Sequence, residues 1–261
     1  KTAYEIVDCD WSSDVCSSDL RLCARDAHQT GAMNMTTGPA LMPLDHLVIA
    51  VHDLEQAMQR HRDMGFRVQV GGKHPGRLSH NALVVFEDGS YFELIAWSAD
   101  APAEAWWHIL QQQGEGLIDF ALLPASTAQV VTQAQARGLP IQGPLEGGRQ
   151  RPDGQQLHWT TARQFSRDLP FLCGDVTPRA WRVPEGECRR HPNGVLGVAK
   201  VLVSVKDLQT SILRYQQLLG PALSAELGPG LARLPIEGCV IELRHHPDAP
   251  EGPIGYELKS R

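Results

Sequence analysis

The chain contains an internal repeat, and this repeat restricts its fold more than any other feature of the sequence. Four blocks recur in the same order further along the chain, with apolar residues at matching positions. The pairs are PLDHLVIAVHDL (43–54) with GVAKVLVSVKDL (197–208), LEQAMQRHRDMG (54–65) with LQTSILRYQQLLG (208–220), GSYFELIAW (89–97) with GCVIELRHH (238–246), and GEGLIDFALLP (114–124) with PEGPIGYELKS (250–260). Such a series indicates a structural unit that occurs more than once.

Each unit is predicted to be a strand, a helix and then three strands. Both helical blocks end in Gly, the residue that best tolerates the left-handed backbone at a helix end. A second, divergent unit follows the first one and carries the same pattern less clearly. The predicted strands are 44–51, 66–71, 80–86 and 90–97 in the first unit, and 116–124, 157–165 and 169–176 in the second; the predicted helices are 54–65, 101–113 and 127–138.

These elements predict an α+β fold of repeated βαβββ units. The first two units, 42–113 and 114–183, form one domain with a polar, turn-rich linker that extends it to residue 193. Residues 194–261 are predicted to hold a third unit and the first strand of a fourth, which we expect to be incomplete.

The first twenty residues, KTAYEIVDCDWSSDVCSSDL, do not fit this plan. DWSSDVCSSDL and KTAYE can both be back-translated into strings that resemble parts of a widely used sequencing adapter. We therefore interpret residues 1–41 as a non-native leader, made of translated adapter and upstream sequence, that packs against nothing. Met33, Met35 and Met42 are candidate starts, and Met42 directly precedes the first predicted strand.

The composition excludes several classes of function. A net charge of −6 and the lack of a basic cluster argue against a nucleic-acid partner. No apolar run is long enough to span a membrane, which excludes a membrane partner, and no secretory signal is evident. Outside the leader, Cys173, Cys188 and Cys239 are scattered and odd in number. This pattern favours a reducing, cytoplasmic compartment.

The strand DHLVIAVHDL, the helix that ends in MGF, the loop GGKHPGRLSHNALV and the strand SYFELIAW together resemble the glyoxalase-like domain family of the vicinal oxygen chelate superfamily. The resemblance covers about residues 42–261. It implies paired βαβββ units whose curled mixed sheets form a cup, and a small molecule as ligand. It also implies a divalent metal (Fe, Mn, Zn, Ni or Mg) in active members, and it leaves a homodimer open.

Transferred position by position, the resemblance places metal ligands at His46, Glu93 and Asp119. The last strand of the second unit, LPFLCGDV, offers no His or Glu as a fourth ligand. In YFELIAW, period-two alternation puts Phe92, Leu94 and Ala96 on one face and Glu93 on the other. Two readings stay open: a metal set, or a hydrogen-bonded His46 beside a Glu93 that pairs with an arginine.

The third unit serves as an internal control for this set. Lys200 stands where His46 stands and Gly255 where Asp119 stands, while Glu242 matches Glu93. A protonated lysine is a poor metal ligand. We therefore expect a Lys200–Glu242 ion pair and a purely structural third unit.

The loop HPGRLSHN supplies further candidates. His74, Arg77 and Asn81 could bind an anionic or carbonyl-bearing ligand, and His80 could act with Glu93 in acid–base catalysis. His158 and Arg163 could face the same cup from the second unit. The alternative is an ordinary exposed hairpin connection.

Two hypotheses for the function follow. The first is a metal-dependent lyase, isomerase or dioxygenase that acts on a small oxygenated metabolite. The second is a metal-free protein of the same fold that sequesters a small ligand.

Overall fold

A computed structural model describes residues 42–260, and the predicted leader of residues 1–41 lies outside this range. Eight strands close into a barrel in the order β1-β4-β3-β2-β6-β7-β8-β5. β1 pairs in parallel with β4 and antiparallel with β5, so the two units meet along β1 and β5. Their bounds are β1 Leu44–Ala50, β2 Gln69–Lys73, β3 Ser79–Val85, β4 Tyr91–Trp97, β5 Gly116–Leu122, β6 Ile141–Gln150, β7 Gln156–Gln164 and β8 Phe171–Asp175.

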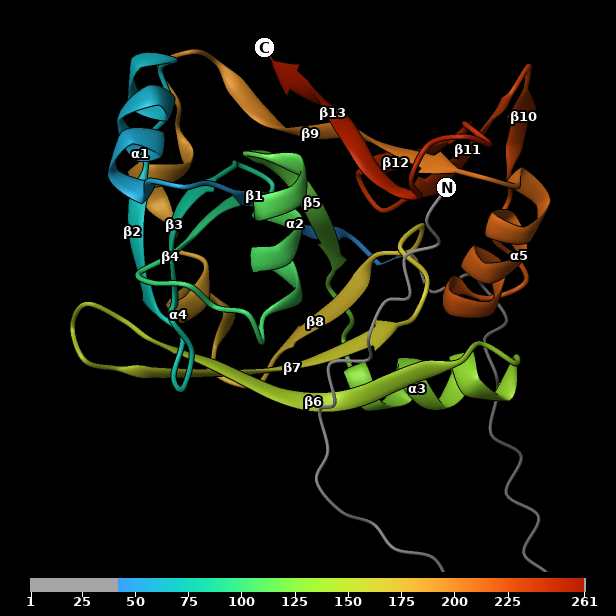
Figure 1. Ribbon diagram of the computed structural model, residues 1–261, viewed down its shortest axis with the longest axis horizontal. Helices are drawn as coiled ribbons and strands as arrows, with labels where there is room; N and C mark the ends of the chain where they lie inside the picture. The colour runs from blue at the N-terminus through green and yellow to red at the C-terminus, as the bar shows by residue number, and fades with distance from the viewer. Residues whose placement is uncertain (1–41, 261) are drawn as a thin grey trace, which may run out of the picture. The chain divides into compact units, whose positions relative to one another are not determined.

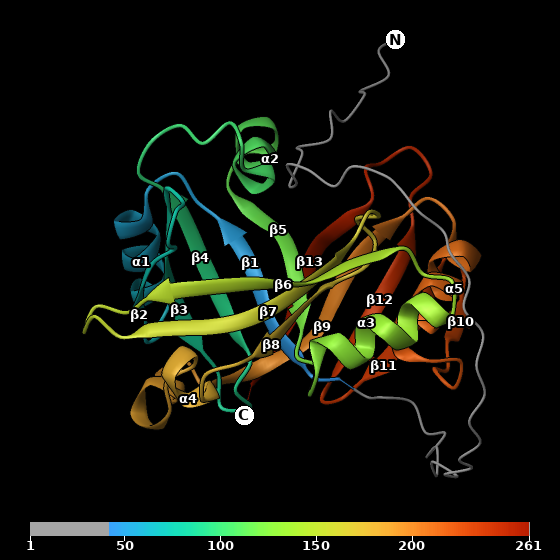
Figure 2. The ribbon, with the colours of Figure 1, turned by 90° about the horizontal axis from the view of Figure 1, so that it is seen from below.

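The helices α1 and α3 lie outside the ring of strands, and α2 lies against β1 and β5 (Figures 1 and 2). Each long helix that follows the first strand of a unit begins at a side-chain cap. The caps are Asp53, Ser126 and Asp207, each of which accepts a hydrogen bond from a backbone N–H three residues on. The helices are α1 Leu54–Asp63, α2 Ala105–Gln113, α3 Thr127–Ala136, α4 Arg179–Arg182 and α5 Leu208–Leu219.

The predicted glycine stops are confirmed. Gly65, Gly138 and Gly220 follow these helices with φ of 83°, 84° and 109°. Only a residue without Cβ adopts such angles easily. Cap, helix and glycine therefore recur in three units, which makes the repeat a structural one.

The third unit forms an open five-stranded sheet in the order β10-β11-β12-β9-β13. β13 pairs with β9 as β5 pairs with β1, and Gly255 lies opposite Leu202 where Asp119 lies opposite Val48. A strand is therefore present at the predicted position after the third unit. The strands are β9 Val195–Val205, β10 Glu226–Gly228, β11 Leu231–Ile236, β12 Cys239–His245 and β13 Gly252–Ser260.

A single hydrophobic cluster joins the outer face of the barrel strands to α1, α3, α5 and the five-stranded sheet. Phe92, Leu94 and Ala96 of β4 belong to it, while Ile95 of the same strand belongs to a second cluster with Phe171. The two predicted faces of β4 are thus confirmed. Glu93, on the face of Ile95, points into the barrel.

Two elements differ from the prediction. β6 was not foreseen, because Gly143, Pro144, Gly147 and Gly148 hide its strand pattern. The linker 184–194 contains a short 3-10 helix, η1 Gly186–Arg189, and its His191 is buried against Phe66. Within the described range, no helix is long and apolar enough to cross a membrane.

Candidate functional site

Glu93 lies inside the barrel with only 6% of its surface exposed. A carboxylate at such a place needs donors or a cation, because burial removes its hydration. Three side chains surround it. The His46 Nε2 lies 3.5 Å from Oε2, the His74 Nε2 lies 3.6 Å from Oε1, and the Asn81 amide donates to Oε1 at 2.5 Å.

His46 is oriented by the residue that precedes it. Its Nδ1 lies 2.6 Å from Oδ2 of Asp45, and its ring stacks on Tyr91 at a centroid distance of 4.7 Å. Burial alone would raise the pKa of Asp45, but Arg182 and His46 hold that pKa well below its ordinary value. An ionised Asp45 accepts hydrogen bonds only, so Nδ1 of His46 carries the proton. Nε2 is then the ring nitrogen that faces the Glu93 carboxylate.

His74 approaches the same carboxylate from the turn between β2 and β3. Its Nδ1 lies 3.0 Å from the Ser79 hydroxyl, which leaves Nε2 directed at Glu93. Burial lowers the pKa of His74 below its ordinary value, only partly opposed by Glu93. The ring is therefore neutral at pH 7. Two imidazoles, each with Nδ1 already engaged, thus aim Nε2 at one buried carboxylate.

Asn81 connects Glu93 to a buried arginine. Its amide N–H is given to Glu93, and its Oδ1 accepts from Nη1 of Arg149 at 3.1 Å. The backbone of Gly71 passes beside this bond. A Cβ on Gly71 would lie 2.0 Å from the Asn81 Oδ1 and 2.3 Å from the Arg149 Nη1, so only glycine leaves room there.

The other arginines of the barrel interior are held by carboxylates. Arg182 donates to both oxygens of Asp45 and of Asp175, and to the Tyr91 hydroxyl. Arg179 donates to the same two carboxylates. These ion pairs keep both guanidinium groups away from Glu93.

Asp119 lies in the barrel wall but is engaged elsewhere. Its Oδ2 accepts from Nη1 of Arg163 at 2.6 Å and from the Trp106 indole at 2.9 Å. Arg163 also covers the ring of Phe171 at 4.6 Å. In the first unit, Glu93 pairs with Val48, which is two residues after His46. In the second unit, Phe171 pairs in the same way with Ala121, which is two residues after Asp119. Phe171 therefore occupies the position of the fourth ligand.

The remaining predicted residues lie apart from Glu93. His80 pairs with Ala96, so it is on the face of β3 opposite to Asn81. Arg77 is exposed and lies 3.9 Å from Glu104. His158 is exposed, and its backbone bonds to Thr177. The structure thus brings together His46, His74, Asn81 and Glu93.

Sequence reasoning missed Asp45 and Arg149. Asp45 had a signal, because it adjoins a predicted ligand and could orient its ring. Arg149 had none, since it sits in a glycine-rich stretch that was not recognised as a strand.

Within residues 42–260, one group of three potential metal ligands is closely spaced. It consists of Asp45, His46 and Cys173, whose donor atoms all lie within 4.8 Å of one another. Arginines already bond both Asp45 oxygens, and burial raises the pKa of the Cys173 thiol. This group is therefore poorly suited to an ion. The Glu93 cluster has the better donors, although its atoms are more widely spaced.

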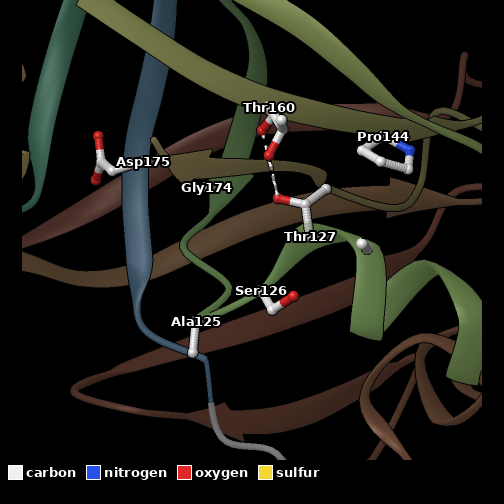
Figure 3. Close-up of a pocket in the computed structure, with 8 residues that line it drawn as sticks. Ala125, Ser126, Thr127, Pro144, Thr160, Gly174 and Asp175 are labelled. Atoms are coloured by element: carbon white, nitrogen blue, oxygen red, sulfur yellow. Dashed lines mark hydrogen bonds between the residues drawn. The ribbon is translucent and has the colours of Figure 1, made fainter. Parts of the chain in front are cut away.

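A cavity of about 220 Å³ lies elsewhere, at the start of α3 (Figure 3). The Thr160 hydroxyl donates to that of Thr127 at 2.9 Å across it. Asp175, its only ionisable lining residue, is held by Arg182. This cavity offers no group for acid–base or metal chemistry.

The family model for a glyoxalase-like domain matches residues 44–219, and the chain belongs to this family of the vicinal oxygen chelate superfamily. No curated protein matches the sequence. A solved hypothetical protein from Staphylococcus aureus is similar in fold, with a TM-score of 0.67 and 13% identity over 83% of this chain and 90% of that one.

Two methylmalonyl-CoA epimerases are also similar to part of the chain. That of Streptomyces coelicolor has a TM-score of 0.39 and 21% identity over 52% of this chain and 99% of its own. That of Mycobacterium tuberculosis has a TM-score of 0.39 and 16% identity over 56% of this chain and 94% of its own.

Proposed function

We propose that the barrel interior around Glu93 is the active site of a metal-dependent enzyme. The enzyme acts on a small oxygenated metabolite, as a lyase, isomerase or dioxygenase. One observation carries this proposal: two imidazoles, fixed through Nδ1, direct Nε2 at a buried carboxylate. A cation placed between these ring nitrogens and the carboxylate would be bound from both sides.

The residues present fit a divalent ion. His46, His74 and Glu93 offer two nitrogens and one carboxylate, a set that suits Fe, Mn, Zn or Ni and leaves positions open for substrate. Their wider spacing requires a movement, which His74 can make because it stands on a turn. A bound ion would supply a Lewis acid that polarises a substrate oxygen. That Asp119 is a metal ligand stays a prediction. Binding of an ion by Asp119 would require its hydrogen bond from Arg163 to break.

The chain's own groups prepare this site. Asp45 fixes the tautomer of His46, and Asn81 holds the Glu93 carboxylate. The apolar side chains of Ile95 and Phe171 exclude water around it. Free thiols at Cys173, Cys188 and Cys239 support a reducing compartment such as the cytoplasm, and a homodimer stays a prediction.

Metal analysis of the full chain tests the proposal. Wild-type protein incubated with Mn²⁺, Fe²⁺, Ni²⁺ or Zn²⁺ and then desalted should retain about one ion per chain. Glu93→Gln and His74→Gln should lose it, whereas Asp119→Asn should keep it. His108→Gln is the matched control, because that imidazole bonds to the Pro102 carbonyl through Nε2.

A wild-type protein that retains no ion, or a Glu93→Gln protein that retains it fully, would contradict metal dependence. Loss of the ion in Asp119→Asn with retention in His74→Gln would instead favour Asp119 as the ligand.

The alternative is a metal-free protein that sequesters a small ligand in the same barrel. The short Asn81–Glu93 bond favours it, because it satisfies one carboxylate oxygen without an ion. Ligand binding that is unaffected by a chelator would support this alternative.

A further inference from the structure

Arg149 and Arg182 are the two arginines that are almost completely buried among the described residues, each with 3% of its surface exposed. Their partners differ. Arg182 bonds to the carboxylates of Asp45 and Asp175. Arg149 has no carboxylate oxygen of residues 42–260 within 4.0 Å of its guanidinium nitrogens. A buried cation without a counter-ion is costly.

The bonds that Arg149 does make involve neutral oxygens. Nη1 donates to the Asn81 amide oxygen, and Nη2 donates to the Arg182 backbone oxygen at 3.1 Å. The Nε–H is buried and has no partner. The Nε–H of Arg149 is therefore a strong hydrogen-bond donor without an acceptor. Only the side-chain amide of Asn81 separates the Arg149 guanidinium from the Glu93 carboxylate.

We propose that Arg149 binds the carboxylate of the substrate, which makes the substrate a small carboxylic acid with a neighbouring oxygen, of the 2-oxo or 2-hydroxy acid class. This inference rests on the proposed function. A carboxylate accepts from Nε–H and a terminal N–H of one guanidinium in a bidentate arrangement. The adjacent oxygen would then lie toward His46, His74 and Glu93.

The charge of the site agrees with this substrate class. Glu93 and Arg149 balance each other through Asn81, and the other buried ion pairs are neutral in sum. A divalent ion would add two positive charges to an interior that has little water. A substrate with one carboxylate offsets one of these two charges, whereas a neutral substrate offsets neither.

We place the route to Arg149 at the turn that carries His74. Pro75, Gly76, Arg77 and Leu78 of this turn are all exposed.

Thermal unfolding of the full chain with added ligand tests the proposal. The probes are acetate, pyruvate, lactate and 2-oxoglutarate, each beside its neutral methyl ester, which for 2-oxoglutarate is the dimethyl ester. Binding to the folded state raises Tm by an amount that grows with the logarithm of the ligand concentration divided by Kd. At least one acid should raise Tm, and its ester should bind at least roughly ten-fold more weakly, because a charge-assisted hydrogen bond is lost.

Variants locate the effect. Arg149→Met should lose about ten-fold or more in affinity for the acid and nothing for the ester, and Arg149→Lys should lie between. Arg151→Met is the matched control, since this arginine is on the same hairpin and pairs with Asp153. Should Arg149→Met fail to fold, Arg149→Lys and the acid–ester difference of the wild type decide.

The outcomes separate this inference from the metal proposal. Acid binding that depends on Arg149 but survives a chelator supports the anion site and counts against the metal. The inference is wrong if no acid raises Tm, if esters bind equally well, or if both Arg149 variants keep the wild-type affinity.

Discussion

Glu93 and Glu242 occupy the same position in two repeats, yet their surroundings differ in charge. Glu242 is 2% exposed and accepts from Arg233 and Arg244, and Lys200 lies 3.4 Å away. The expected Lys200–Glu242 ion pair is thereby confirmed. Both oxygens of Glu242 are occupied by cations of the chain itself.

Glu93 instead meets an amide and two imidazoles. Three arginines of the first two units, Arg163, Arg179 and Arg182, pair with other carboxylates. The difference teaches that a buried carboxylate becomes available for a ligand when neighbouring cations are bound elsewhere. A carboxylate saturated by cations, as in the third unit, only stabilises the fold.

The largest change in the free energy of unfolding is expected at Asp45, whose carboxylate pairs with Arg179 and Arg182. Asp45→Ala leaves the buried Arg182 and the half-buried Arg179 with one carboxylate fewer. Breaking a buried ion pair from one side costs about 3–5 kcal/mol. Urea unfolding of the full chain should show a loss of this size.

Glu93→Gln is the control for Asp45, because it has nearly the same shape and no arginine partner within 4.0 Å among the described residues. It should cost much less than Asp45→Ala. Equal losses would mean that Asp45 has no special role in holding the arginines.

Glu242→Gln should have an intermediate, pH-dependent effect. Burial alone would raise the pKa of Glu242, but hydrogen bonds from Arg244 and Arg233 lower it below its ordinary value. Stabilisation by a carboxylate with a lowered pKa is complete above the unfolded pKa of about 4.3 and is lost as the pH falls through the folded pKa. At pH 7 the variant should be less stable by about 1–3 kcal/mol.

Chemical unfolding between pH 3 and pH 7 measures this difference. It should stay constant down to about pH 5 and then shrink. A difference that grows on acidification would contradict the assigned direction of the pKa change.

Local patterns of the sequence predicted the strands that carry the site, but not the hydrogen bonds between residues far apart in the chain. Alternation along β4 placed Glu93 in the interior, and the repeat predicted the Lys200–Glu242 pair. The glycine stops were visible for the same reason, because each depends on a few adjacent residues.

The missing parts depend on contacts between distant residues. Arg163 reaches Asp119 across 44 positions and Arg149 reaches Asn81 across 68. Neither contact leaves a period or a motif in the sequence. Closure of the barrel through the Lys73–Gln150 pairing of β2 and β6 brings Arg149 toward Asn81, whereas the pairing of β8 with both β5 and β7 brings Arg163 toward Asp119.

The smallest effect is expected from converting the third unit toward the first. Lys200→His places an imidazole at the position of His46, next to Glu242. We expect no new metal site, because Arg233 and Arg244 still occupy both oxygens of Glu242. The free energy of unfolding should change by less than about 1 kcal/mol, since the lysine is partly exposed and its ion pairs are weak. Metal analysis should give the same number of ions per chain as the wild type. An additional ion would show that the identity of the first-strand residue, rather than the placement of the arginines, separates the two regions.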